Sequence, residues 1–215
     1  MKKIAFAITC LMAPSYCYSN TGVGFPFQKK FEIYKVVGNS ADEIEKSFNG
    51  SKPNFLKMNG FDGHTAWKYN FHTDDETCEI YDFGLRITYT LPQLEMSILS
   101  PESTEEYRSY IEKLYRHEQV HCALTVKHMR EIFLAFKAGQ LGECGSANQR
   151  TIELERELKE DNELFDVYTS HGEIELAESP FGEESYLKIC EIPYEPISPH
   201  IYKRLRFQDT FYYLN

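Results

Sequence analysis

The sequence of 215 residues is 42% hydrophobic and 26% charged, which is the balance of a soluble globular protein with one domain of ordinary size. Its formal net charge of −10 excludes nucleic acid as the main partner, because phosphate contacts need a basic face. No apolar run beyond the N-terminal segment approaches the length of a membrane span, so we expect no integral membrane segment in the mature chain.

Residues 1–19 have the order of regions found in a secretory signal peptide. Lys2 and Lys3 give a positive start, residues 4–12 are apolar, and Cys17 and Ser19 are small residues at the positions that signal peptidase inspects. We therefore predict an exported protein, either periplasmic or secreted, whose mature chain begins near Asn20.

Four cysteines remain after removal of such a signal peptide. In an oxidising compartment four cysteines favour two disulfides, for which three connectivities are possible. The spacing contains no Cys-x-x-Cys pair, so a cysteine-rich zinc site is not expected. The four residues are Cys78, Cys122, Cys144 and Cys190.

The first part of the mature chain carries strand and turn signals. Alternating aromatic and β-branched residues predict strands over residues 31–37, 65–72 and 78–91. A short helix is expected at residues 41–48, followed by a looped stretch rich in Asn, Gly and Pro. These elements predict a small, mainly antiparallel sheet with one buried face.

The spacing of apolar residues then changes to three and four, which predicts helices. Ser103 and Glu106 fit a capping box at the start of a long helix that ends near Gly139. After a turn, a second helix is predicted over residues 148–168. Because the connection is short, the two helices should form an antiparallel hairpin.

The predicted fold class is therefore α+β, with the small sheet packed on the long two-helix hairpin. We expect a single domain at residues 20–172 and a C-terminal extension, residues 173–215, packed on the same domain. Within the extension, strand signals are found at residues 186–189 and 207–214.

The most informative segment is residues 117–121, which read His-Glu-Gln-Val-His. On a helix, His117 and His121 lie one turn apart on the same face, so both imidazoles can reach one Zn²⁺ at about 2.0–2.1 Å. Glu118 flanks that face and can take the proton of a zinc-activated water as the water attacks a carbonyl. The pattern predicts one zinc ion per chain and a zinc-dependent hydrolase.

A catalytic zinc normally has a third protein ligand. His128 lies roughly 10 Å along the helix axis from His121, too far to share the metal. A hairpin that reverses near residue 142 places residues 164–168 opposite the histidine motif. We expect His171, at the end of the second helix, to be the third ligand. Asp166 is the alternative, either as a ligand or as the partner of a histidine's second ring nitrogen.

The paired motifs resemble those of the DUF922 family of predicted secreted zinc-dependent proteases. The resemblance covers residues 31–172 and rests mainly on the helix motif and on a second motif about fifty residues later. The matching positions are His117-Glu118-x-x-His121, Asp166-x-x-Thr169-x-His171-Gly172, Tyr34-x-Val36-x-Gly38, Gly63-x-Thr65-x-Trp67, Cys78, Leu91-Pro92 and Cys144.

The resemblance implies a role for each matching position of the two motifs. It makes Glu118 the catalytic base and gives Asp166 and Thr169 supporting roles. The implied zinc ligands are His117, His121 and His171. It also implies a Cys78–Cys144 disulfide, which leaves Cys122 to pair with Cys190.

One departure from the family concerns the residue before the aspartate, where the family commonly has Tyr and this chain has Phe165. If the family hydroxyl stabilises the oxyanion of the transition state, another group must do so here. The two candidates are Tyr168 and His64.

We therefore expect an exported zinc metallopeptidase that cleaves peptide or protein substrates. The alternative is a non-catalytic envelope binding protein that uses zinc to fix its helical hairpin. A third hypothesis is a metal-free binding module that holds a partner on the aromatic face of the sheet.

Overall fold

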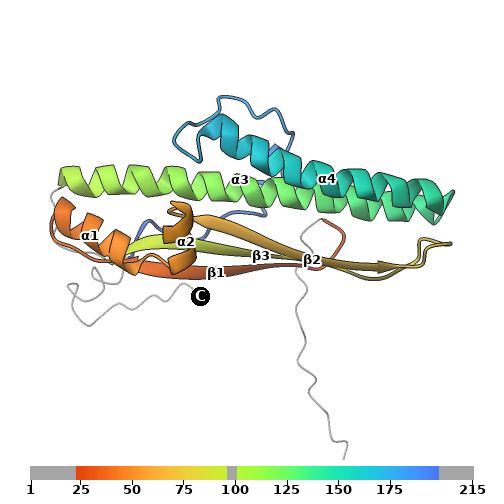
Figure 1. The fold of residues 1–215 in the computed structure, drawn as a ribbon, viewed down its shortest axis with the longest axis horizontal. Coiled ribbons are helices and arrows are strands. Elements are labelled where there is room, and N and C mark those ends of the chain that lie inside the picture. The colour runs from red at the N-terminus through yellow and green to blue at the C-terminus, as the bar shows by residue number, and fades with distance from the viewer. Residues whose placement is uncertain (1–22, 96–100, 199–215) are drawn as a thin grey trace, which may run out of the picture.

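The computed structural model describes residues 23–95 and 101–198, which form one sheet and two long helices, one packed along the sheet and the other against the first helix (Figure 1). The α+β class with a small sheet is confirmed. The predicted signal peptide lies outside the described residues. Among the described helices, none combines the length and the apolar character that crossing a membrane requires.

The sheet is mostly parallel, so the predicted antiparallel sheet is wrong. Its strands are β1 (Phe27–Val36), β2 (His64–Thr73), β3 (Ile80–Glu95) and the short β4 (Ile197–Ser198). The central strand β3 pairs in parallel with β1 and β4, and only β2 runs antiparallel to it.

The connection between β1 and β2 explains this topology. It contains two short helices, α1 (Ala41–Ser51) and α2 (Asn54–Asn59), of which the second falls in the stretch expected to be a loop. The connection carries the chain past β3, so that β2 and β3 form a hairpin and β1 occupies the other edge of β3. Alternation in the sequence defines which face of a strand is buried but not its neighbour or direction.

The two long helices are α3 (Pro101–Gly139) and α4 (Cys144–Thr169), and α4 packs against α3 after a short turn (Figure 1). Helix α3 begins at Pro101, a residue suited to the first turn because it lacks an N–H, so Ser103 lies inside the helix and is not its cap. Helix α4 ends at Thr169 and is capped by Ser170, whose φ of 48° is left-handed.

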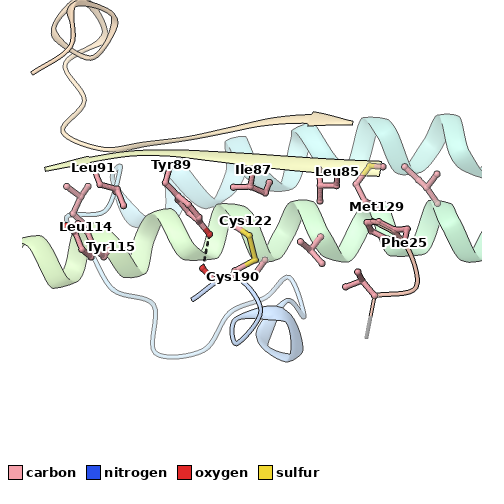
Figure 2. Packing of buried hydrophobic residues seen from close by; sticks show 14 of the residues in the cluster. Phe25, Leu85, Ile87, Tyr89, Leu91, Leu114, Tyr115, Cys122, Met129 and Cys190 are labelled. Carbon is pink, nitrogen blue, oxygen red and sulfur yellow. Dashed lines mark hydrogen bonds between the residues drawn. A yellow bond between two sulfur atoms is a disulfide. The ribbon is translucent and has the colours of Figure 1, made fainter. Parts of the chain in front are cut away.

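The core lies between β3 and α3. Alternate residues of β3 point toward α3 and meet the apolar face of that helix (Figure 2). Burying one such side chain stabilises the fold by about 1.5–3 kcal/mol. The central members on β3 are Leu85, Ile87, Tyr89 and Leu91, and those on α3 include Ile111, Leu114, Cys122 and Met129.

The described part of the extension, residues 173–198, packs on this same core. The hydroxyl of Tyr89 donates a hydrogen bond to the Cys190 carbonyl at 2.8 Å, next to a disulfide between Cys122 and Cys190 (Figure 2). The strand expected at residues 186–189 is instead the end of a 3₁₀ helix, η1 (Glu184–Tyr186), and a turn. The other expected strand, residues 207–214, lies outside the described residues.

A second disulfide joins Cys78 to Cys144. It ties the connection between β2 and β3 to the first residue of α4. Both pairings are those implied by the family resemblance. Two disulfides are typical of proteins in oxidising compartments and fit an extracellular protein.

Replacing both Cys122 and Cys190 by Ser should destabilise the protein by about 2–4 kcal/mol, because the disulfide closes a loop with a sequence separation of 68. Urea unfolding followed by circular dichroism measures the loss. In reducing buffer the wild type and the variant should unfold at nearly the same urea concentration. An unchanged midpoint in oxidising buffer would contradict a stabilising role for this bond.

Candidate metal centre

Two histidines of α3 and one aspartate of α4 meet at a single point between the helices. The Nε2 atoms of His117 and His121 lie 3.1 Å apart, and the Asp166 Oδ1 lies 3.1 Å from the first and 3.0 Å from the second. Both histidines are about 8% exposed. These three side chains, His117, His121 and Asp166, could together hold a metal ion. They are called the metal-ligand group below.

The second ring nitrogen of each histidine faces a hydrogen-bond acceptor on α4. The Asn162 amide donates to the Leu158 carbonyl at 2.7 Å, which directs its oxygen toward His121 Nδ1 at 2.8 Å. The Thr169 hydroxyl donates to the Phe165 carbonyl at 2.7 Å, and its oxygen faces the other histidine. That oxygen lies 3.4 Å from His117 Nδ1.

These acceptors place a proton on Nδ1 of both rings. The Nε2 lone pairs of His117 and His121 therefore point at each other and at a carboxylate oxygen. Such an arrangement requires a proton or a cation between them. The tautomers that these contacts select are the ones in which both histidines can act as metal ligands.

The electrostatics of the group agree with this requirement. Burial lowers the pKa of His121, but the hydrogen bond to Asp166 and the charges of Glu118 and Asp166 outweigh it, so the pKa lies above its usual value. Burial raises the pKa of Asp166, but the hydrogen bonds from both histidines hold it well below the usual range. The Asp166 carboxylate thus stays negatively charged beside the two Nε2 atoms, where a cation could bind.

Glu118 lies beside the metal-ligand group and is only 4% exposed. The Thr65 hydroxyl, near the start of strand β2, donates to the Glu118 Oε2 at 2.7 Å. A Cβ atom added to Gly63 would lie 2.9 Å from the Glu118 Oε1 and 3.0 Å from the Leu114 Cδ1. The Glu118 carboxylate is therefore held between α3 and the start of β2. It fits there because Gly63 has no side chain.

The loop before β2 is anchored through Asp62. The Tyr34 hydroxyl donates to the Asp62 carbonyl at 2.6 Å, and the Asp62 carboxylate bonds to Lys52 and Tyr110. These contacts from β1, the end of α1 and α3 fix Gly63 against Glu118.

An open cleft of about 1330 Å³ runs over the metal-ligand group, between β2 on one side and α3 and α4 on the other. Strand β2 is at an edge of the sheet, since its other side has no strand partner among residues 23–95 and 101–198. Its first residues, His64, Thr65 and Trp67, line the cleft, as does Glu118.

A family model described as "Bacterial protein of unknown function (DUF922)" matches residues 31–172. The chain belongs to the DUF922 family. Neither a curated protein nor a solved structure matches it. The DUF922 range begins within β1 and ends just after α4, so it contains every residue of the metal-ligand group and of the support for Glu118. The C-terminal extension, residues 173–215, lies outside it.

The structure places the expected third ligand, His171, at the margin of the group. Its Nδ1 lies 3.7 Å from the Asp166 Oδ1, and its side chain is 61% exposed and lies against Phe61. The alternative, Asp166, is the residue that joins the two histidines. Backbone geometry keeps His171 near: it is left-handed, with φ 55°, and is followed by Gly172 with φ 91°.

The two expected oxyanion donors are placed differently. His64 lines the cleft. Tyr168 does not; its ring stacks on Phe181, with 6.0 Å between the ring centroids. Phe165, which replaces the common DUF922 tyrosine, is buried and stacks on the His117 ring at a centroid distance of 4.9 Å. At this position the chain supplies packing that orients an imidazole.

Sequence reasoning did not identify Asn162 or assign roles to Gly63 and Thr65. A signal for Asn162 was present, because it is a polar residue in the buried stripe of α4, one turn before Asp166. The family resemblance includes Gly63 and Thr65, but their role could not be assigned from sequence, since it depends on a contact between β2 and α3.

Replacing Asn162 by Ala should weaken binding of a divalent metal by about 10–100-fold, because His121 Nδ1 loses the acceptor that orients its ring. Zinc competition with a chromogenic chelator measures the affinity. The control is Asn148→Ala, which changes the same residue type near the other end of α4, where it contacts Asp75. Equal affinities in the two variants would contradict the orienting role.

Proposed function

We propose that this protein is an exported zinc-dependent peptidase whose zinc ligands are His117, His121 and Asp166, with His171 beside them. One observation carries the proposal: two buried imidazole nitrogens and a carboxylate oxygen converge on one point at the floor of an open cleft. A metal cation would satisfy a buried convergence of this kind, and the open side leaves room for substrate.

The ligand atoms favour zinc over harder cations. Zinc takes imidazole nitrogen and carboxylate oxygen at about 2.0–2.2 Å, so two ligand atoms of a tetrahedral site lie about 3.3 Å apart. The distances among the three atoms here are 3.0–3.1 Å, a triangle that a small outward movement would fit to zinc. Magnesium and calcium would require more oxygen ligands.

Glu118 is the proposed general base. When bound, zinc acidifies a water molecule and polarises a substrate carbonyl. Glu118 accepts the proton as the water attacks and passes it to the leaving amine. The Thr65 hydroxyl holds one carboxylate oxygen, and this leaves the other, Oε1, to take the proton. His64, on the cleft wall, is the candidate donor to the developing oxyanion.

The proposed substrate is a peptide in extended conformation. Strand β2 is an open edge that begins beside Glu118, so its backbone groups can pair with a substrate strand. This pairing would hold the scissile carbonyl against the metal-ligand group without demanding a particular side chain.

The replacement Glu118→Gln should lower cleavage of an unstructured fluorescent casein by about 10²–10⁴-fold while one zinc stays bound, since an amide cannot accept the proton. The matched control is Glu106→Gln, at an exposed position lining the same cleft, which should cleave normally. Equal activity of Glu118→Gln and wild type would contradict the proposed base. Zinc bound without any cleavage by wild type would instead support the non-catalytic envelope protein.

Gly63→Ala should reduce turnover by roughly 100-fold with little loss of zinc, because the added Cβ would displace the Glu118 carboxylate. Gly50→Ala is the control, since a Cβ there meets nothing within 4 Å. Steady-state kinetics and zinc content are measured on both proteins. Full activity in Gly63→Ala would show that the close approach does not position the base.

A further inference from the structure

A second histidine site lies further along the same pair of helices. His128 of α3 is 1% exposed. Its Nε2 lies 2.7 Å from the Asp161 Oδ2 of α4, so this nitrogen donates to the carboxylate. Its other nitrogen, Nδ1, is buried and has no hydrogen-bond partner within residues 23–95 and 101–198. A buried polar atom left without a partner destabilises the folded protein by about 1–3 kcal/mol, so a ligand bound at Nδ1 would stabilise it.

Two carboxylates face this nitrogen. The Glu131 Oε2 lies 3.5 Å from His128 Nδ1, and Glu157 approaches from α4. One ligand atom from each of these three residues lies within 4.8 Å of the other two. The three donors come from both helices, so an ion among them would join α3 to α4.

A protonated His128 would satisfy Nδ1 only weakly. The N–H at Nδ1 would face the Glu131 Oε2 at 3.5 Å, an ion-pair distance outside hydrogen-bonding geometry among the described residues. A neutral ring places a lone pair there, facing a carboxylate, which is unfavourable unless a cation lies between them. The Nε2–H bond to Asp161 selects this neutral tautomer, as a carboxylate behind a metal-bound histidine does.

The surrounding charges leave an excess of negative charge. Arg150 contacts both oxygens of Glu157, at 2.9 and 3.3 Å, and also pairs with Glu153 at 3.2 Å. The Lys127 Nζ is 3.8 Å from the Asp161 carboxylate. Each carboxylate oxygen has two lone pairs, so Glu157 can keep Arg150 and still bind an ion. With Glu131, four carboxylates face two cationic side chains.

We propose that His128 Nδ1, Glu131 and Glu157 form a second divalent-metal site, distinct from the His117–His121–Asp166 group, that clamps α3 to α4. One imidazole and two carboxylates suit a transition-metal dication such as zinc. The ion bridges two helices and lines no part of the cleft, so its role is structural. This proposal does not depend on the proposed peptidase function.

The second site is tested by measuring zinc content and thermal unfolding in proteins whose His117–His121–Asp166 group has been disabled by His121→Gln. The His121→Gln protein should still bind about one zinc per chain, and added Zn²⁺ should raise its unfolding temperature by several degrees. The His121→Gln/His128→Gln protein should bind none and show no shift. As a control, His121→Gln/His72→Gln alters an exposed histidine 3.8 Å from Asp82 and should behave like His121→Gln.

A folded His121→Gln protein without zinc, or zinc that stays bound in the double variant, would overturn the second site. If His128→Gln impairs folding, Glu131→Gln replaces it, because that side chain is 37% exposed and its loss should weaken zinc at least tenfold. Unchanged affinity there would also overturn the proposal. Failure of the peptidase proposal is seen separately, as wild-type protein that cleaves nothing while His121→Gln keeps its zinc.

Discussion

The antiparallel packing of α4 against α3 is the constraint on which the candidate metal centre depends. The histidines of α3 are one turn apart, and α4 brings Asp166 to their Nε2 atoms and Asn162 to the Nδ1 of His121. Because the same pairing supplies the proposed ligand and the groups behind the histidines, a shift of α4 by one turn would disrupt all of these contacts. The Cys78–Cys144 disulfide ties the first residue of α4 to the strand hairpin and limits such a shift.

Much of the fold could be predicted from the sequence because its apolar residues recur with clear helical and strand periodicity. The helical spacing of apolar residues placed α3 and α4 to within a few residues, and alternation located β1, β2 and β3. Strand order could not be obtained this way. The parallel pairing of β1 with β3 follows from a crossover through α1 and α2, and alternation carries no information about which strand lies beside which.

The candidate site was predictable where its residues share one helix. The i, i+4 spacing of His117 and His121 is a local property, and the structure places their Nε2 atoms 3.1 Å apart. Sequence spacing did not decide between Asp166 and His171 as the third ligand. The two residues lie little more than one helical turn apart, and which of them reaches the histidines depends on how α4 ends. The support of Glu118 by Thr65 joins residues 53 positions apart, a contact that only the assembled fold reveals.

The proposed zinc site can be tested by anomalous diffraction at the zinc absorption edge from crystals of the zinc-supplemented protein. We expect a peak about 2.0–2.2 Å from the Nε2 atoms of His117 and His121 and from a carboxylate oxygen of Asp166. The peak should face the cleft beside Glu118. Zinc-supplemented crystals with no peak among these three side chains would contradict the metal centre and the hydrolytic function built on it.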